Sequence, residues 1–246
     1  MVWIVFALFL AVWQVVGAFN DNAYYVSSPL EIGRQLLVWG TDGYLWPHLL
    51  ASVESTLAGF VVAAVLAISL ALAIASSPRA GQILEPFLLA AFSTPKIVVA
   101  PLLIFWVGVG SAPVIVLAAL SSFFVIFYGA YGPLRDVPRG YFDTAAVLGA
   151  GAWTTATRFR LPAAAPEVLA GLQQGLIYAF HGAVLGEMTA SNTGMGYVIM
   201  YSATSMDSAS VLAALAVIGA VSFVLTQVLG RAAQNFSDPL TVEAMP

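Results

Sequence analysis

The chain has 246 residues, of which 61% are hydrophobic and 8% are charged, and its formal net charge is −4. A soluble domain carries about 25% charged residues, so eight basic and twelve acidic side chains cannot cover a soluble globule of this size. The composition therefore predicts an integral membrane protein. The absence of cysteine excludes disulfides and cysteine-based metal or redox sites, and two histidines without metal-like spacing argue against a metalloenzyme.

A membrane-crossing helix needs about 20 mostly apolar residues. Six segments meet this requirement, so we expect an all-α, polytopic membrane protein with about six transmembrane helices. In chain order the predicted spans are Val2–Phe19, His48–Ala75, Ile83–Val109, Val114–Leu134, Glu167–Thr189 and Val211–Ala232. The first segment could also be a signal peptide, but no basic region precedes it and Gly17-Ala18 is a weak cleavage site, so a retained helix is favoured.

The third predicted span contains Pro86, Pro95 and Pro101. Proline removes a backbone donor and clashes with the preceding helical turn, so this span should be kinked or broken. A broken helix is tolerated at membrane depth only where protein or a water-filled cavity surrounds it. The polar segments between spans should hold two further short helices, an amphipathic one over Pro29–Trp39 and an interfacial one over GMGYVIMYSA.

The basic residues predict the orientation of the spans. Six of them would lie on one side of the membrane: Arg79, Arg135, Arg139, Arg158, Arg160 and Arg231. The other side receives only Arg34, and Lys96 lies within a span. Positive residues gather on the cytoplasmic side, which predicts that both termini and the segment 135–162 are cytoplasmic.

That cytoplasmic segment is longer than the 2–8 residues that a helix connection usually takes. PRGYFDTAAVLG reads as a short helix with Pro138 near its start and Gly149 as its stop. Tyr141, Ala145 and Leu148 would share one face of it. A second short helix is expected from about Ala152 to Arg158. These residues alone leave open whether the segment is a solvated loop or a knob that a soluble partner grips.

The spacing in this segment resembles the signature of the permease subunits of ATP-binding-cassette importers, which runs Glu-Ala-Ala, Gly, Ile and Leu-Pro. Here the pattern is Asp143-Thr144-Ala145, Gly149, Phe159 and Leu161-Pro162, with every gap conserved and three side chains changed. The stretches SSPLEIGRQL, ESTLAGF, STPKIVVAPLLIFWVGVG, LPAAAPEVLAGLQQGL and GEMTASNTGMGYVI are similar to the nitrate, sulfonate and taurine branch of that family. The resemblance covers about residues 28–235.

The resemblance implies a MetI-like permease core over residues 48–235, preceded by an amino-terminal helix and outer loop (1–47) and followed by a tail (236–246). It implies a transport subunit of the bacterial inner membrane, not an enzyme, for a small polar or anionic solute such as nitrate, a sulfonate or taurine. The chain has no GxxxxGK[ST] stretch to cradle phosphates. It would therefore contain no cofactor of its own, and ATP with Mg²⁺ would bind to the partner ATPase.

The implied partners are a second permease copy in a homodimer, two ATPase subunits, a periplasmic solute-binding protein and membrane lipid, with no nucleic acid. The segment 135–163 would be the coupling loop, which receives force from the ATPase. Its implied contact residues are Tyr141, Phe142, Asp143, Thr144, Ala145, Leu148, Gly149, Ala150, Leu161 and Pro162.

Polar side chains inside spans are costly and suggest function. The candidate pathway residues are Glu54, Ser93, Lys96, Gln174, His181 and Glu187. Lys96 could line the pathway, pair with a carboxylate or reach the interface. His181 is favoured as a packing or hydrogen-bonded residue and Glu187 as a structural or gating one. Further uncharged candidates for a channel lining are Ser52, Ser55, Thr94 and Gln173. Gly171-xxx-Gly175 and Gly182-xxx-Gly186 should allow close helix packing.

Two other classes of protein were weighed against the importer subunit. A self-contained secondary transporter predicts inverted repeats and a charged site at the bilayer midplane, and the sequence shows no convincing repeat. A membrane enzyme predicts a nucleophile or paired acid and base within reach of each other, and His48 and His181 have no evident partner.

Overall fold

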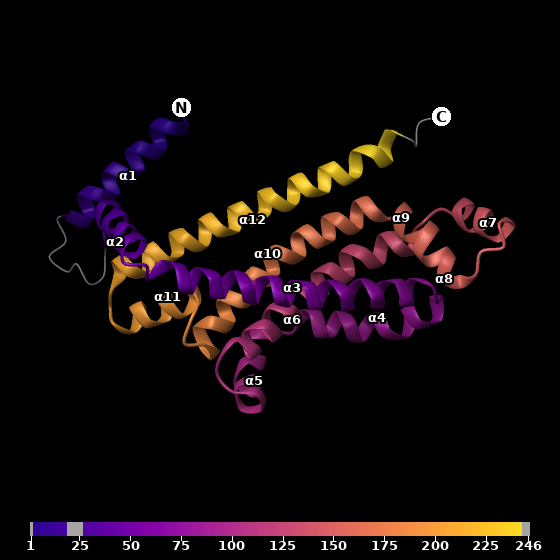
Figure 1. Ribbon diagram of the computed structural model, residues 1–246, viewed down its shortest axis with the longest axis horizontal. Helices are drawn as coiled ribbons and strands as arrows, with labels where there is room; N and C mark the ends of the chain where they lie inside the picture. Colours follow the sequence, from indigo (N-terminus) through magenta and orange to yellow (C-terminus); the bar gives the residue numbers. More distant parts are fainter. Residues whose placement is uncertain (1, 19–26, 243–246) are drawn as a thin grey trace.

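The computed structural model describes residues 2–18 and 27–242, and every element within those ranges is helical. Figure 1 shows long helices side by side along one axis, with shorter helices at both ends. The elements are α1 (Val2–Ala18), α2 (Pro29–Thr41), α3 (Leu45–Ala75), α4 (Pro78–Ser93), the 3₁₀ turn η1 (Lys96–Val99), α5 (Ala100–Val107), α6 (Ser111–Arg135), α7 (Arg139–Val147), α8 (Ala152–Thr155), the π-helical turn η2 (Ala156–Arg160), α9 (Leu161–Ala163), α10 (Ala165–Ala190), α11 (Met195–Thr204) and α12 (Ser208–Val242). The predicted all-α class is confirmed.

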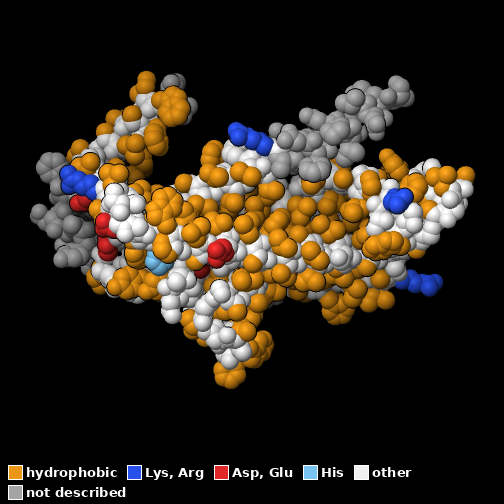
Figure 2. Space-filling view, viewed as in Figure 1, with side chains coloured by type: hydrophobic (Ala, Val, Ile, Leu, Met, Phe, Trp, Pro, Cys, Tyr) orange, Lys and Arg blue, Asp and Glu red, His pale blue; other side chains and the backbone are white. Residues whose placement is uncertain are grey.

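Four described helices are long and apolar enough to cross a membrane: α3, α6, α10 and the Ser208–Arg231 part of α12. They correspond to the second, fourth, fifth and sixth predicted spans. Hydrophobic side chains cover most of the face shown in Figure 2, where charged ones are few. Such a surface suits lipid, and the backbone polar groups of these helices are satisfied within each helix.

The third predicted span is broken. The helices on the two sides of the break, Arg79–Ser93 and Lys96–Val107, meet at an angle of 83°. Thr94 and Pro95 between them have extended backbone conformations, because a residue before proline is pushed out of the helical region. The predicted break of this span is confirmed, and it lies at Pro95.

The two ends of the chain differ from simple spans. α1 has 17 residues and packs on α2, where Trp13 Nε1 donates a 2.9 Å hydrogen bond to the Ser27 carbonyl. In Figure 1, α1 lies beside α2 and not along the bundle of α3, α6 and α10. At the other end, the helix α12 runs on into the predicted tail as far as Val242.

The tightest packing in the bundle joins α10 to α6. All four glycines of the two small-residue repeats in α10 face α6, so a Cβ added at any of them would come within about 3 Å of that helix. Such a Cβ would lie 2.2 Å from Ile126 Cγ1 at Gly175 and 2.7 Å from the Leu117 carbonyl oxygen at Gly182. The predicted role of these repeats in helix packing is confirmed.

The two ends of the bundle have separate cores. At one end, near α7 to α9, Ile74, Phe127, Tyr131 and Leu134 are buried together, and Phe142 packs against them. At the opposite end α2, α11 and α12 share a second cluster. Its buried members are Trp39, Met195, Val198, Ile199, Ala213 and Ala214. Helix α2 is held at its start by a capping box between Ser28 and Glu31. The Ser28 backbone N–H donates to the Glu31 carboxylate and holds its pKa below the usual value.

Candidate functional site

The segment predicted to be the coupling loop, residues 135–163, folds as two short helices joined through glycine. Helix α7 ends in a pair of closing hydrogen bonds, from Gly149 N to the Ala146 carbonyl (3.0 Å) and from Ala150 N to the Ala145 carbonyl (2.9 Å). This is the Schellman arrangement, which requires a left-handed residue after the helix. Gly149 supplies it with φ +68°. The predicted stop at Gly149 and the helix that follows from Ala152 are confirmed.

Some side chains of this loop pack against the bundle, and the others are exposed. Ala145 is buried and Phe142 and Leu161 pack on the core of the bundle. Tyr141 and Leu148, which were expected to share a face with Ala145, are exposed. The remaining predicted contacts Asp143, Thr144, Gly149 and Pro162 are exposed, and Ala150 is half-buried. Val147, Leu148 and Trp153 form an apolar tip, with exposures of 87%, 69% and 76%.

At the opposite end of the bundle, Glu187 is buried with only 2% of its surface exposed. Its Oε2 accepts two hydrogen bonds of 2.8 Å, from the Ser52 hydroxyl on α3 and from the Gly196 backbone N–H. Ser52 Oγ in turn accepts a 2.8 Å hydrogen bond from the Met195 N–H. The carboxylate and the hydroxyl thus satisfy two orphan donors at the start of α11 and join it to α3 and α10.

Two glycines of the GMG stretch permit this contact. A Cβ on Gly194 would lie 2.1 Å from Glu187 Cδ, and one on Gly196 would lie 2.2 Å from the Val184 carbonyl oxygen. Gly194 also has φ +102° and donates to His48 Nδ1 at 3.2 Å. Ser52 is therefore fully buried and not a channel lining, which corrects that expectation.

Glu54 and Glu187 line one pocket of about 310 Å³ between α3, the start of α6 and the loop after α10. Ser55, Ser191 and Thr193 line it as well. Glu54 is exposed, whereas Glu187 Oε1 is buried and lacks a hydrogen-bond partner among the described residues. The structure thus brings together two of the six predicted pathway residues.

Gln174 and His181 lie on one exposed face of α10, together with Tyr178 and Leu185. The spacing of seven residues places the first two almost in line along the helix. His181 is therefore not buried as a packing residue in this chain, and its ring lies 6.0 Å from that of Tyr178. Glu187, six residues beyond His181, lies on the opposite, buried side of α10.

Ser93 and Lys96 lie at the break between α4 and η1. The Ser93 hydroxyl is exposed and donates to the Leu89 carbonyl at 3.0 Å. The Lys96 ammonium donates to the Phe92 carbonyl and lies 5.0 Å from the Phe92 ring and 4.9 Å from the Phe124 ring of α6. Lys96 therefore bridges the break to α6 through cation–π contacts.

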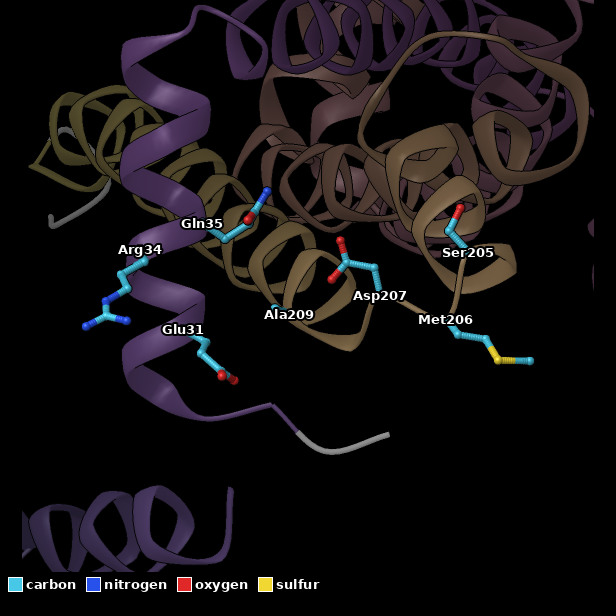
Figure 3. Close-up of a pocket in the computed structure, with 7 residues that line it drawn as sticks. All are labelled: Glu31, Arg34, Gln35, Ser205, Met206, Asp207 and Ala209. Carbon is cyan, nitrogen blue, oxygen red and sulfur yellow. The ribbon is translucent and has the colours of Figure 1, made fainter. Parts of the chain in front are cut away.

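A pocket of about 400 Å³ opens between α2 and the turn from α11 to α12. Figure 3 shows its lining residues: Glu31, Arg34 and Gln35 come from α2, and Ser205, Met206, Asp207 and Ala209 from the turn and the start of α12. An adjoining pocket of about 620 Å³ shares Gln35, Ser205 and Asp207 with it. Together they form a hollowed surface at the end of the molecule opposite the coupling loop.

Sequence reasoning missed the partners of Glu187 and the residues of this hollowed surface. The closely spaced glycines at 194 and 196 were an available signal for the first, since they mark a close approach of backbone to another group. No local signal marked the second, because its two sides are about 170 residues apart. Among the described residues, no three His, Asp or Glu side chains are arranged to hold a metal ion.

Comparison with known families gives one match over most of the chain. Residues 34–241 match the family described as binding-protein-dependent transport system inner membrane component. A putative aliphatic sulfonates transport permease protein of Bacillus subtilis is 31% identical over 195 residues, which cover 79% of this chain and 71% of that protein. A riboflavin transport system permease protein of Chloroflexus aurantiacus is 30% identical over 224 residues, which cover 91% and 84%.

The fold is similar to a chain of the MetNI methionine transporter, a solved structure described as inward facing. The TM-score is 0.65 at 18% sequence identity, and the match covers 82% of this chain and 96% of that one. At this identity the likeness concerns the fold. It confirms the predicted MetI-like arrangement of helices.

Proposed function

Because the chain belongs to the family of binding-protein-dependent transport system inner membrane components, and is thus the permease subunit of an ATP-binding-cassette importer and not an enzyme, we propose that residues 135–163 are the element that its ATPase grips. The observation that carries this proposal is the apolar tip of Val147, Leu148 and Trp153, which belongs to the segment of α7 and α8 at one end of the molecule in Figure 1. Large exposed apolar side chains beside a rigid turn are typical of a docking surface. Two ATPase subunits, which bind ATP and Mg²⁺, would act on two such loops.

The test is reconstitution of the permease with its ATPase and binding protein in liposomes, followed by measurement of ATP-driven solute uptake. Trp153→Ser should weaken capture of the ATPase, and with it ATP-driven uptake, about tenfold or more, since truncating a central aromatic anchor costs about 2 kcal/mol or more. Trp46→Ser, at the opposite end of the molecule and 54% exposed, is the matched control. Equal capture by both variants would count against the proposal.

The second part of the proposal is a homodimer whose pathway runs beside α10. The exposed face of α10 carries Gln174, Tyr178 and His181. Polar groups facing hydrocarbon are costly, so this face should meet a second copy or the water of the pathway. Because the chain has no cysteine, His181→Cys introduces a single thiol, and oxidative cross-linking reports its approach to a second copy. Val65→Cys, on an exposed apolar face of α3, is the control.

The proposed solute is small and polar or anionic, in the range of nitrate, sulfonates and taurine. The names of the relatives support a small solute, since one is described as a sulfonate and the other as a riboflavin permease. Lys96 at the broken span offers a cation for an anionic group. A thermal-shift screen of the partner binding protein, followed by uptake assays with the hits, tests the solute class.

The proposed orientation in the bacterial inner membrane puts the coupling loop in the cytoplasm. Arg79, Arg135, Arg139, Arg158 and Arg160 all belong to elements at that end of the bundle, which the positive-inside rule favours. The hollowed surface beside α2 would then face the periplasm and the binding protein. α12 runs back toward the coupling loop, as a cytoplasmic carboxyl end requires. Figure 1 gives no such support for a cytoplasmic start of α1, which stays a prediction.

A further inference from the structure

Arg160 joins the coupling loop to the end of α3. It is the last residue of η2, and its Nη1 donates a 2.9 Å hydrogen bond to Ser76 Oγ in the turn after α3. The opposite side of the guanidinium faces α7, where its central carbon lies 4.7 Å from the centre of the Phe142 ring. A planar guanidinium can stack its face on a ring while it donates from its edge, whereas an ammonium has no flat face to stack.

The contact continues into the backbone of α3. Ser76 Oγ donates a 2.8 Å hydrogen bond to the Leu72 carbonyl in the last turn of that helix. A cation near the carboxyl end of a helix is stabilised by the helix macrodipole. Half-burial of Arg160 lowers the pKa of its guanidinium, yet arginine stays charged in proteins because its ordinary pKa exceeds 12. The charge is thus held at a fixed place between two elements.

The backbone conformation before Pro162 directs the Arg160 side chain toward α3. The Leu161 N–H bonds to the Ala156 carbonyl five residues back, so η2 is a single π-helical turn. Proline at 162 would press its ring against the Arg158 carbonyl in a regular helix, and the wider turn relieves this contact. One extra residue in a turn rotates the side chains beyond it by about 100°. The turn therefore directs Arg160 inward, while Arg158 is exposed.

α3 is one continuous helix from Leu45 to Ala75. Its other end carries Ser52, which is bonded to Glu187 and to the start of α11. From Ser52 to Ser76 the helix spans about 36 Å at 1.5 Å per residue. A displacement applied at Ser76 is thus carried along a rigid element to the Glu187 contact at the far end.

We propose that Arg160 is a positioning residue that links α7 to α3, so that movement imposed on the coupling loop by the ATPase reaches α3 and, through it, the contact that holds α11. The proposal rests on the coupling role given above to residues 135–163. Its chemistry is specific, because one guanidinium contacts an aromatic ring on α7 and a hydroxyl that is bonded to the last turn of α3.

The test measures solute transported per ATP hydrolysed by the full complex in liposomes, for Arg160→Gln, Ser76→Ala and Arg158→Gln. The first variant removes both contacts, and the ratio should fall about tenfold, the effect of losing one charged hydrogen bond. Ser76→Ala should lower the ratio by a smaller factor while leaving the loop sequence intact. Arg158→Gln removes an equal charge from an exposed position of the same segment, so any loss it causes reports the effect of charge on the ATPase contact alone, and its ratio should fall clearly less than that of Arg160→Gln.

Arg160→Lys adds a second readout, because a lysine can reach Ser76 without stacking flat on Phe142, and it should restore the ratio only in part. An unchanged ratio for Arg160→Gln overturns the proposal, as does an equal fall for Arg158→Gln. If Arg160→Gln does not assemble with the ATPase, an unchanged ratio for Ser76→Ala overturns the proposal instead. Failure of the wild-type complex to take up solute with ATP would count against the coupling role itself, so the two failures are distinguishable.

Discussion

Ser52 and Glu187, which lie 135 positions apart in the chain, share a 2.8 Å hydrogen bond in the buried space between α3 and α10. Each also accepts a backbone N–H from the first turn of α11. Two spans and an outer helix therefore meet at one carboxylate and one hydroxyl. Helix α11 cannot shift relative to α3 without leaving buried donors unpaired, which makes this contact a latch at the end of the bundle opposite residues 135–163.

Removing the carboxylate should loosen that latch. Glu187→Ala leaves the Ser52 hydroxyl and the Gly196 N–H without their acceptor, and each buried unsatisfied group costs about 1–3 kcal/mol. We expect a clear fall in the thermal unfolding midpoint of the detergent-purified protein. Glu187→Gln keeps a carbonyl acceptor of the same reach and should lose less. A midpoint unchanged by Glu187→Ala would show that the latch contributes nothing to stability.

The glycine that covers this carboxylate is predicted to be equally intolerant of change. Gly194→Ala would place a methyl group 2.1 Å from Glu187 Cδ at φ +102°. The backbone conformation costs about 1–3 kcal/mol for an alanine, and the displaced carboxylate adds to it. Gly43→Ala is the matched control, since Gly43 also has positive φ (+77°) but has open space around it. Unfolding midpoints should rank wild type, then Gly43→Ala, then Gly194→Ala, and equal values for the two variants would contradict the steric argument.

Much of the fold could be predicted from the sequence because its signals are local. Long apolar segments define the spans, Pro95 defines the break, and Gly149 defines the end of α7. The latch and the Arg160 contact could not be predicted in this way. Ser52 reads as one more small polar residue in an apolar helix, and only the tertiary packing of α3 on α10 shows that it is bonded to Glu187.

The candidate site shows the same division. The spacing from Asp143 to Pro162 predicts that this segment is the coupling loop, but which of its side chains are exposed depends on how the segment lies on the bundle. Periodicity places Tyr141, Ala145 and Leu148 on one face. Burial separates them, since Ala145 packs inward and the other two do not. His181 was expected to pack or to be hydrogen-bonded, and its exposure follows from the direction in which α10 presents its glycines to α6.

The turn at Gly149 should be essential for coupling. Gly149→Val forces a β-branched residue into φ +68°, which is strongly disfavoured and would undo the Schellman hydrogen bonds that fix α8 relative to α7. We expect transport per ATP, or the affinity of the permease for the ATPase, to fall about tenfold or more. The reason is that strain of about 1–3 kcal/mol falls on the loop itself. Gly151→Val is the control, because Gly151 has φ −70° and no atom within 4 Å of an added Cβ. Full activity of Gly149→Val would contradict the coupling assignment.

Lys96 has two possible contributions to transport, and the structure allows them to be separated. Its ammonium lies over the Phe92 and Phe124 rings beside the broken span, so it offers both a charge for the solute and a bridge from the break to α6. Lys96→Ala removes both, and we expect uptake to fall about tenfold, the effect of losing one charged contact, while the amount of assembled complex stays the same. Lys96→Arg keeps the charge and the ring contacts and should retain most activity.

Lys96→Met decides between the two contributions, because it keeps the length and apolar body of the side chain without its charge. If the charge serves the solute, uptake by Lys96→Met should be as low as that of Lys96→Ala at every solute concentration that saturates the binding protein. If the side chain acts only by bridging the break, methionine should restore much of the uptake through sulfur–aromatic contacts with the same two rings. Wild-type uptake by both variants would remove Lys96 from the transport mechanism altogether.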